Sequence, residues 1–283
     1  MKKIICKDYT VTGEKFELIY NSEFDMFVTT PKPDKNDLGK YYNSENYISH
    51  TDANKTLFEK IYQLVKSYSL RKKVKLINTF DLQGKQLLDV GCGTGSFLQK
   101  ATNSNWQVSG VEPNKDARNI AEQKLPKKAS LYKSLENLVS NAKPNSFDVI
   151  TLWHVLEHVS DLDAYIKNLK TLLKPKGILL VAVPNYKSYD AIYYHEFWAA
   201  YDVPRHLWHF SQNSIKRLFQ EHQMKLIKVL PMKFDSYYVA LLSEKYQKGK
   251  SNPFTAFKIG FLSNLKAKKS GEYSSLIYLL KKE

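Results

Sequence analysis

Residues 87–98 read Leu87-Leu88-Asp89-Val90-Gly91-Cys92-Gly93-Thr94-Gly95-Ser96-Phe97-Leu98. In this stretch an apolar strand ends in a carboxylate, three alternating glycines follow, and a helix begins. Glycines let the backbone approach a ligand closely, and a helix N-terminus offers free N–H donors to it. For such a motif taken alone, a tight turn without a ligand is the alternative. The stretch therefore indicates a strand–turn–helix unit and a candidate ligand site.

The sequence around this turn alternates between strands and helices. Short apolar runs at 86–90, 107–111, 130–133, 147–153 and 178–183 alternate with helical segments near 96–103, 114–124, 135–141 and 161–173. The later elements are a helix near 211–222, a strand near 225–230, helical stretches at 235–247 and 253–266, and a strand at 274–280. Alternation of this kind predicts an α/β fold, with a parallel sheet covered by helices on both faces.

The residues before the turn predict a smaller unit. Residues 15–20 and 25–29 have the composition of short strands. Apolar side chains at helical spacing then predict a long amphipathic helix from about Leu57 to Ile77, with Asp52 or Asn54 as its cap.

Composition limits the class of protein. The chain has 283 residues, of which 43% are hydrophobic and 25% charged, and these values are typical of a globular protein rather than a disordered one. Its net charge of +15 suggests nucleic acid or an anionic membrane as a partner. Only four of the basic residues are arginines, the usual readers of phosphates and bases, so a lysine-rich solvated surface is favoured instead.

The cysteines and the apolar runs indicate a cellular compartment. Cys6 and Cys92 are too few for a disulfide framework or a four-thiolate zinc site. The start of the chain has no signal-peptide core, and no apolar run reaches 18 residues. We therefore expect a cytoplasmic protein without a spanning helix.

A second carboxylate follows the glycine turn by about twenty residues. Glu112 ends the next predicted strand, where it can accept hydrogen bonds from both hydroxyls of a ribose. The turn has the pattern Asp-x-Gly-x-Gly-x-Gly rather than the Gly-x-Gly-x-x-Gly of nicotinamide enzymes. With these motifs in this order, residues 84–230 resemble the class I S-adenosylmethionine-dependent methyltransferases.

The resemblance implies a doubly wound, mostly parallel seven-stranded sheet whose last strand is antiparallel, and S-adenosylmethionine as the cofactor. It also implies a set of cofactor contacts along the chain: Asp89 at the amino-acid end, the backbone of Gly91, Cys92 and Gly93 beside the methionine, Glu112 on the ribose, Pro113 beside the adenine, and the side chain of Ser134 or the backbone of Leu135 at the adenine amino group.

The resemblance also divides the chain into parts. Residues 1–52 are expected to form a small β-containing N-terminal region, in which the tyrosines Tyr41, Tyr42 and Tyr47 belong to a lid over the cofactor. Residues 53–283 are expected to form the methyltransferase domain, with 231–270 as a cap insertion. Related bacterial enzymes open with a cysteine-rich zinc ribbon, which Cys6 alone does not support.

In this family the strand at 147–153 points toward the transferred methyl group, so Trp153 and His154 are expected to line the reaction centre. The run from His154 to His158 also matches the H-x-x-E-H pattern of zinc peptidases. That pattern needs a helix, whereas this run continues a buried strand, so no metal is predicted. Glu157 and His158 are instead expected to form a hydrogen-bonding pair at a helix start.

Two segments bear on the acceptor. Leu152-Trp153-His154-Val155 replaces the Asn/Asp-Pro-Pro-aromatic motif of enzymes that methylate base amines, which disfavours that chemistry. The run Pro-Arg-His-Leu-x-His-Phe-Ser from residue 204 is similar to one in a bacterial branch related to ubiquinone-type O-methyltransferases. There Arg205 would pair with an acidic group of the acceptor, and His206 or His154 would remove a proton. Alternatively, Arg205 and His206 bond to loop carbonyls and hold a lid.

We therefore expect methyl transfer to a small-molecule acceptor, with an oxygen atom favoured. An RNA methyltransferase and a non-catalytic cofactor-binding module are the alternatives. Phenylalanines and lysines in 253–269 suggest a basic amphipathic helix that could contact a membrane surface, although packing over the acceptor pocket or against a second subunit is favoured. The sequence leaves the oligomeric state open.

Overall fold

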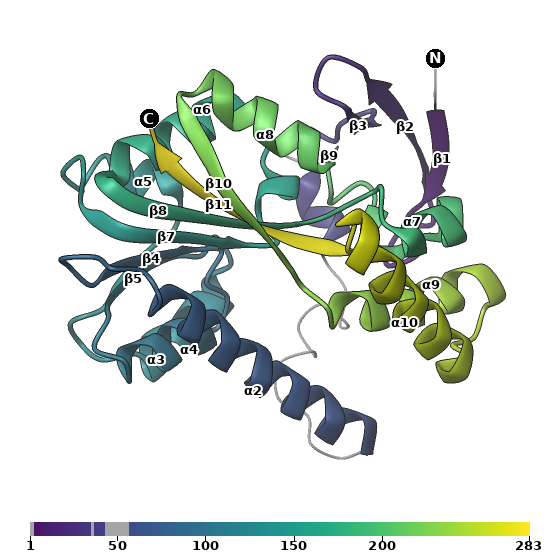
Figure 1. Ribbon diagram of the computed structural model, residues 1–283, viewed down its shortest axis with the longest axis horizontal. Coiled ribbons are helices and arrows are strands. Elements are labelled where there is room, and N and C mark those ends of the chain that lie inside the picture. The colour runs from purple at the N-terminus through teal and green to yellow at the C-terminus, as the bar shows by residue number, and fades with distance from the viewer. Residues whose placement is uncertain (1–2, 35–36, 43–56) are drawn as a thin grey trace.

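A seven-stranded sheet lies at the centre of the computed structural model, which describes residues 3–34, 37–42 and 57–283 (Figure 1). Its strands, in spatial order, are β10 (Met224–Pro231), β11 (Ser275–Lys282), β8 (Leu173–Pro184), β7 (Phe147–Trp153), β4 (Gln86–Val90), β5 (Gln107–Val111) and β6 (Ser130–Tyr132). Only β11 runs antiparallel to its neighbours. The predicted α/β fold with an antiparallel last strand is confirmed.

Helices cover both faces of this sheet, as Figure 1 shows. One face carries α2 (Leu57–Ile77), α3 (Ser96–Thr102) and α4 (Lys115–Lys124), and the other α5 (Leu135–Val139), α6 (Leu162–Leu172) and α8 (Gln212–Glu221). Successive side chains of a strand point to opposite faces, so Leu87 packs with the first group of helices while Leu88 and Val90 pack with the second. Burial on both faces explains why the strands are continuous apolar runs.

Most predicted elements form within a few residues of their expected bounds, but two strands were missed. β1 (Lys3–Lys7) is short, with a lysine at each end, and β9 (Trp208–His209) has only two residues. β9 forms by pairing with β3 (Met26–Thr30), about 180 residues earlier in the chain. Such a distant pairing leaves no local periodicity for sequence reasoning to detect.

The N-terminal strands join the rest of the chain through β9. β1, β2 (Lys15–Asn21), β3 and β9 form a second, antiparallel sheet in that order. A third apolar core joins this sheet to α7 (Tyr189–Tyr194), α9 (Asp235–Lys248) and α10 (Pro253–Ser270), with Phe27, Tyr194 and Trp198 among its most buried members. The N-terminal region and the late insertion therefore pack as one cap beside the main sheet.

Several expectations concern residues outside the described part of the chain. The capping residues Asp52 and Asn54, the lid tyrosine Tyr47 and the domain boundary at residue 52 all fall within 43–56, so they stay predictions. Within the described residues, none of the helices combines the length and the apolar character needed to cross a bilayer.

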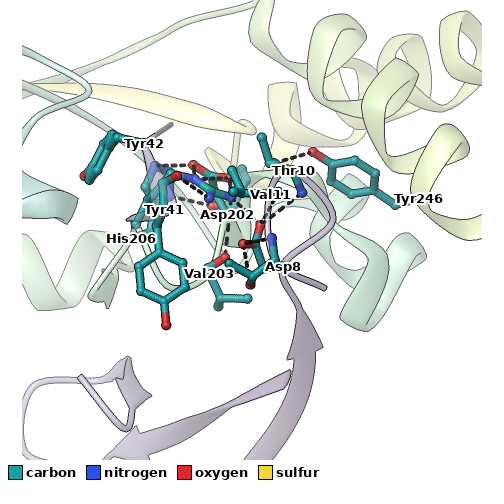
Figure 2. Close-up of polar contacts among 12 residues, drawn as sticks. Asp8, Thr10, Val11, Tyr41, Tyr42, Asp202, Val203, His206 and Tyr246 are labelled. Atoms are coloured by element: carbon teal, nitrogen blue, oxygen red, sulfur yellow. Dashed lines mark hydrogen bonds and ion pairs between the residues drawn. The ribbon is translucent and has the colours of Figure 1, made fainter. Parts of the chain in front are cut away.

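A buried guanidinium joins the loop before β9 to the N-terminal region. The side chain of Arg205 is 1% exposed, and its Nη2 donates to Asp8 Oδ1 at 2.9 Å and to Asp202 Oδ1 at 2.7 Å. Its Nη1 donates to the carbonyl oxygen of Tyr41 at 3.0 Å. Figure 2 shows this cluster, in which Asp8 also accepts a hydrogen bond from the backbone N–H of Thr10. Arg205 lowers the pKa of Asp8 despite the opposing effect of burial, so both charges persist at neutral pH.

Replacing this guanidinium should destabilise the protein. We expect Arg205→Ala to lower the free energy of unfolding by about 3–5 kcal/mol, because it leaves the carboxylate of Asp8 buried and unpaired. Urea unfolding followed by circular dichroism measures this change. The control is Arg71→Ala, since Arg71 lies exposed on α2 and should change stability by less than about 0.5 kcal/mol. Equal stability of the two variants would contradict a structural role for Arg205.

Candidate active site

The glycine turn after β4 leaves one side of the backbone open. Gly91, Gly93 and Gly95 have φ angles of +72°, +54° and +74°, in the left-handed region that favours glycine. A Cβ added at Gly91 would collide with the side chain of Val155, whereas one at Gly93 would have no atom within 4 Å. The turn therefore packs tightly at Gly91 and is open to a ligand at Gly93.

Glu112 lies against this opening. Its Oε2 accepts a hydrogen bond from the Gly93 N–H at 2.8 Å, and its Oε1 accepts one from the Asn114 N–H at 2.8 Å. These bonds fix the carboxylate between two strand ends while each oxygen keeps a lone pair for a further donor. A carboxylate held beside an open glycine turn fits the predicted role of accepting ribose hydroxyls.

The predicted adenine contacts lie beside Glu112. The Glu112 N–H donates to the carbonyl of Tyr132 in β6 at 3.0 Å, and residues 133–135 follow directly. Ser134 caps α5 by accepting from the N–H of Asn137 at 3.1 Å, and the side chain of Leu135 is buried in the core. Of Leu135, only the backbone is therefore available to an adenine, whereas the Ser134 hydroxyl keeps its own O–H donor. Pro113 is exposed at the end of β5.

Two ionisable side chains, those of Asp89 and Lys73, interact electrostatically near the end of β4. The carboxylate of Asp89 is buried and accepts a 2.6 Å hydrogen bond from Thr151 Oγ1. Burial raises the pKa of Asp89 to about 7, against the opposing effects of Thr151 and of the Lys73 ammonium. Lys73 comes from α2, and its Nζ lies 4.1 Å from the centroid of the Trp153 ring. Sequence reasoning missed Lys73, because the run Arg71-Lys72-Lys73 looks like a solvated helix face.

Two further predicted residues complete the cofactor side. Trp153 ends β7 and packs edge-on against Phe97, and its buried Nε1 has no hydrogen-bond partner among the described residues. An orphaned donor at a strand end is consistent with a site that takes a polar ligand. Cys92 is buried, which raises the pKa of its thiol and keeps it from acting as a nucleophile.

His154 is held between two carboxylates. It has a φ of +58°, an uncommon conformation for a residue other than glycine and one that clusters at functional sites. Its Nδ1 lies 3.4 Å from Glu157 Oε1 and its Nε2 3.1 Å from Asp235 Oδ2. Burial lowers the pKa of His154, but the two carboxylates outweigh it and raise the value to about 9. Asp235 starts α9, and sequence analysis did not associate it with the site.

A pocket of about 370 Å³ opens beside these groups. Both Lys73 and Asp235 line it, so it adjoins Trp153 and His154. Its size falls within the range of small-molecule sites. The remaining lining is largely apolar with two further lysines: Tyr68, Ser69, Lys72, Leu76, Leu230, Pro231, Met232, Lys233, Phe234 and Ile277.

His206 lies in a different environment from His154. Its Nδ1 donates to the carbonyl of Ala200 at 2.8 Å, and its ring stands edge-on to that of His158 with centroids 4.6 Å apart. This placement favours the alternative in which His206 bonds to a loop carbonyl, rather than a role as the base.

The H-x-x-E-H run does not have the helical geometry of the zinc peptidases whose pattern it matches. Residues 156–158 make a single 3-10 turn, and His154 pairs with Asp235 instead of lying on one helix face with His158. Potential ligand atoms of Glu157, His158 and His206 do lie within 4.8 Å of one another. Burial and the neighbouring His206 lower the pKa of His158 to about 4, so its ring is neutral at neutral pH. The absence of a metal stays a prediction.

Arg205 does not reach the pocket. Asp8, Asp202 and the backbone of Tyr41 take hydrogen bonds from all three of its guanidinium nitrogens, and the side chain is buried. The prediction that Arg205 pairs with the acceptor is therefore not supported by its placement. Its bonding agrees with the alternative, in which it holds the loop.

The comparisons with known proteins agree with this geometry. A family model described as a methyltransferase domain matches residues 60–229. The ubiquinone biosynthesis O-methyltransferase of Rhodopseudomonas palustris (strain TIE-1) is 37% identical over 113 residues, which cover 38% of this chain and 44% of that protein. The enzyme of the same name from Actinobacillus pleuropneumoniae is 36% identical over 111 residues, covering 37% and 47%. The chain thus spans less than half the length of these relatives.

Solved structures share the fold at low sequence identity. Magnesium protoporphyrin IX methyltransferase from Synechocystis, with bound S-adenosylhomocysteine, has a TM-score of 0.57 and 15% identity, covering 88% of this chain and all of that one. An S-adenosylmethionine-dependent methyltransferase from Archaeoglobus fulgidus has a TM-score of 0.52 and 16% identity, covering 78% and 94%. Because the family model matches more than half of the chain, and the sheet order and the glycine turn agree with it, the chain belongs to the class I S-adenosylmethionine-dependent methyltransferases.

Proposed function

We propose that this methyltransferase transfers the methyl group to a hydroxyl of a small-molecule acceptor, with His154 as the base. The observation that carries the proposal is the position of His154 at the end of β7, beside the pocket and between Asp235 and Glu157. Its curated relatives are named as O-methyltransferases, which supports an oxygen acceptor. A pocket of about 370 Å³ suits a small molecule better than an RNA strand.

When bound, the cofactor would supply an activated methyl group on a positively charged sulfur, which leaves as the neutral thioether once the methyl is transferred. The protein has to align this methyl group with the acceptor hydroxyl, exclude water and take up one proton. Nδ1 of His154 lies 3.4 Å from the buried carboxylate of Glu157, and Nε2 lies 3.1 Å from Asp235 at the pocket. Nε2 is therefore the nitrogen that would receive the acceptor proton once the acceptor hydroxyl takes the place of Asp235 beside it. Asp235 would then stabilise the positive imidazolium that results.

We further propose that Asp89 and Lys73 hold the two ends of the cofactor's amino acid. An α-amino acid carries an ammonium and a carboxylate, and these two side chains provide one charge of each sign beside Trp153. Glu112 would hold the ribose on the other side of the glycine turn, where its carboxylate already contacts Gly93.

Loss of the Glu112 carboxylate should weaken cofactor binding. We expect Glu112→Ala to bind S-adenosylhomocysteine about 10- to 100-fold more weakly, because two charge-assisted hydrogen bonds are lost. Isothermal titration calorimetry measures this, with Glu122→Ala on the exposed face of α4 as the matched control. Unchanged affinity in Glu112→Ala would refute the ribose assignment, and NAD serves as the ligand that should not bind.

Lys73 should matter only for ligands that have a carboxylate. We expect Lys73→Met to bind S-adenosylhomocysteine about tenfold more weakly. Its affinity for 5′-methylthioadenosine, which lacks the amino-acid end, should be unchanged. Lys75→Met is the control, since Lys75 is an exposed neighbour on α2. If Lys73→Met lowered the affinity for both ligands equally, the Lys73 side chain would maintain the structure of the site rather than bind the ligand carboxylate.

The pH dependence of turnover tests His154 as the base. A histidine accepts a proton only when neutral, so kcat/KM should rise with pH and reach half of its plateau near pH 9. Asp235→Asn removes a carboxylate that raises the pKa of His154. The rise in kcat/KM should therefore occur at a pH lower by at least about one unit. His154→Gln should lower kcat by about 10²- to 10⁴-fold.

The control for this experiment is Asp116→Asn, because Asp116 is exposed on α4, a helix on the far side of the glycine turn. Its profile should match that of the unsubstituted enzyme. A profile without a rise, or one that Asp235→Asn does not move, would show that another group takes the proton.

A further inference from the structure

Helix α10 presents an apolar stripe to solvent. Phe254, Phe257, Phe261 and Leu265 are 90%, 64%, 49% and 47% exposed. They are spaced by three, four and four residues, so they lie on one face of the helix. The opposite face is buried, with Ala256 and Ile259 in the third core, and Gly260 packs against Tyr237 of α9. The buried face packs this helix against the protein, so the fold does not account for the exposed apolar stripe.

All the charged side chains of the same helix are basic. It carries Lys258, Lys266, Lys268 and Lys269, all exposed, and its sequence contains no aspartate or glutamate. Lys258 and Lys269 border one edge of the apolar stripe on the helix surface. Large apolar residues bordered by lysines are the composition of a helix that lies in the interface of an anionic bilayer.

Aromatic contacts connect this stripe to the mouth of the pocket. Phe257 packs against Tyr237 with ring centroids 5.3 Å apart, and Tyr237 follows Phe234 by three residues in the first turn of α9. Phe234 in turn packs against Tyr68 of α2 at 5.5 Å. Both Phe234 and Tyr68 line the pocket, and they are 43% and 46% exposed. Monomeric proteins rarely expose an apolar patch that extends over three helices.

We propose that this surface, formed by the α10 stripe, Phe234 and Tyr68 and referred to as the α10 face, docks onto an anionic membrane surface. The phenylalanines insert among the lipid chains while the flanking lysines pair with acidic headgroups. The pocket then opens toward the bilayer, and its acceptor is an amphiphile presented from the lipid. This last point rests on the proposed function, whereas the docking itself does not.

Vesicle co-sedimentation tests the docking with the full chain. We expect the protein to pellet with vesicles of phosphatidylcholine mixed with phosphatidylglycerol, and much less with phosphatidylcholine alone. The double substitution Phe254→Ser and Phe257→Ser should reduce the bound fraction at least about tenfold, since most of the inserted apolar surface is removed. Lys258→Gln with Lys269→Gln should reduce binding to the acidic vesicles selectively.

Ile120→Ser is the matched control, because Ile120 is also an exposed apolar residue, 38% exposed on α4, but lies outside the α10 face. It should bind vesicles as the unsubstituted protein does. Failure to bind acidic vesicles, or binding that the phenylalanine substitutions leave intact, would overturn the proposal. So would a concentration-dependent dimer in light scattering that dissociates in the Phe254→Ser, Phe257→Ser variant, since a second copy would then cover the face.

Titration with S-adenosylhomocysteine in solution separates this proposal from the proposed function. The phenylalanine variant should bind that ligand with unchanged affinity, because none of the cofactor contacts lies on α10. Vesicle binding with no turnover of any hydroxyl acceptor would refute the proposed function and leave the docking surface in place.

Discussion

The shared direction of four neighbouring strands is the constraint on which the rest of this site depends. β6, β5, β4 and β7 run parallel, so their carboxyl ends meet at one edge of the sheet. That edge gathers Glu112, Asp89 and Trp153, which are far apart along the chain. Residues just beyond a strand end need not continue the ladder, so glycine can take up a left-handed turn there and leave room for a ligand.

The charges at this edge are paired across elements from opposite ends of the chain. Lys73 from α2 balances Asp89 beside Trp153, and Asp235 from α9 balances His154. Asp235 raises the pKa of His154, while Asp89 and Lys73 each oppose the effect of burial on the pKa of the other. Lys73 and Asp235 thus come from two helices outside the strand–turn–helix unit of the glycine turn.

The cap is held together by its own apolar core and by a buried arginine. Its core joins the N-terminal sheet to α7, α9 and α10, and the buried Arg205 fixes the loop after β8 to Asp8 and Tyr41. Because α9 belongs to this cap, the placement of Asp235 against His154 depends on how the cap packs on the sheet. The same packing leaves the outer face of α10 exposed beside the pocket. The packing of the cap on the sheet therefore determines both the position of Asp235 beside His154 and the exposure of the α10 face.

The sequence by itself determined the sheet, its helices and the cofactor turn. Their signals are local: apolar runs of strand length, helical periodicity, and glycines at positions such as Gly91 and Gly93 where φ is positive. The expected role of Glu112 rests likewise on its distance along the chain from the glycine turn. These features depend on contacts within one strand–turn–helix unit, so they can be predicted without the rest of the fold.

Only the tertiary structure decided what surrounds His154 and Arg205. Asp235 and Lys73 enter the site from elements about 80 residues before or after β7, and no sequence period records such contacts. Arg205 has the sequence of a substrate-binding residue in a loop, yet it is buried, because Asp8 lies beside it in the folded chain. Burial and charge pairing arise from packing between distant segments, and they decide which of several plausible side chains can meet a substrate.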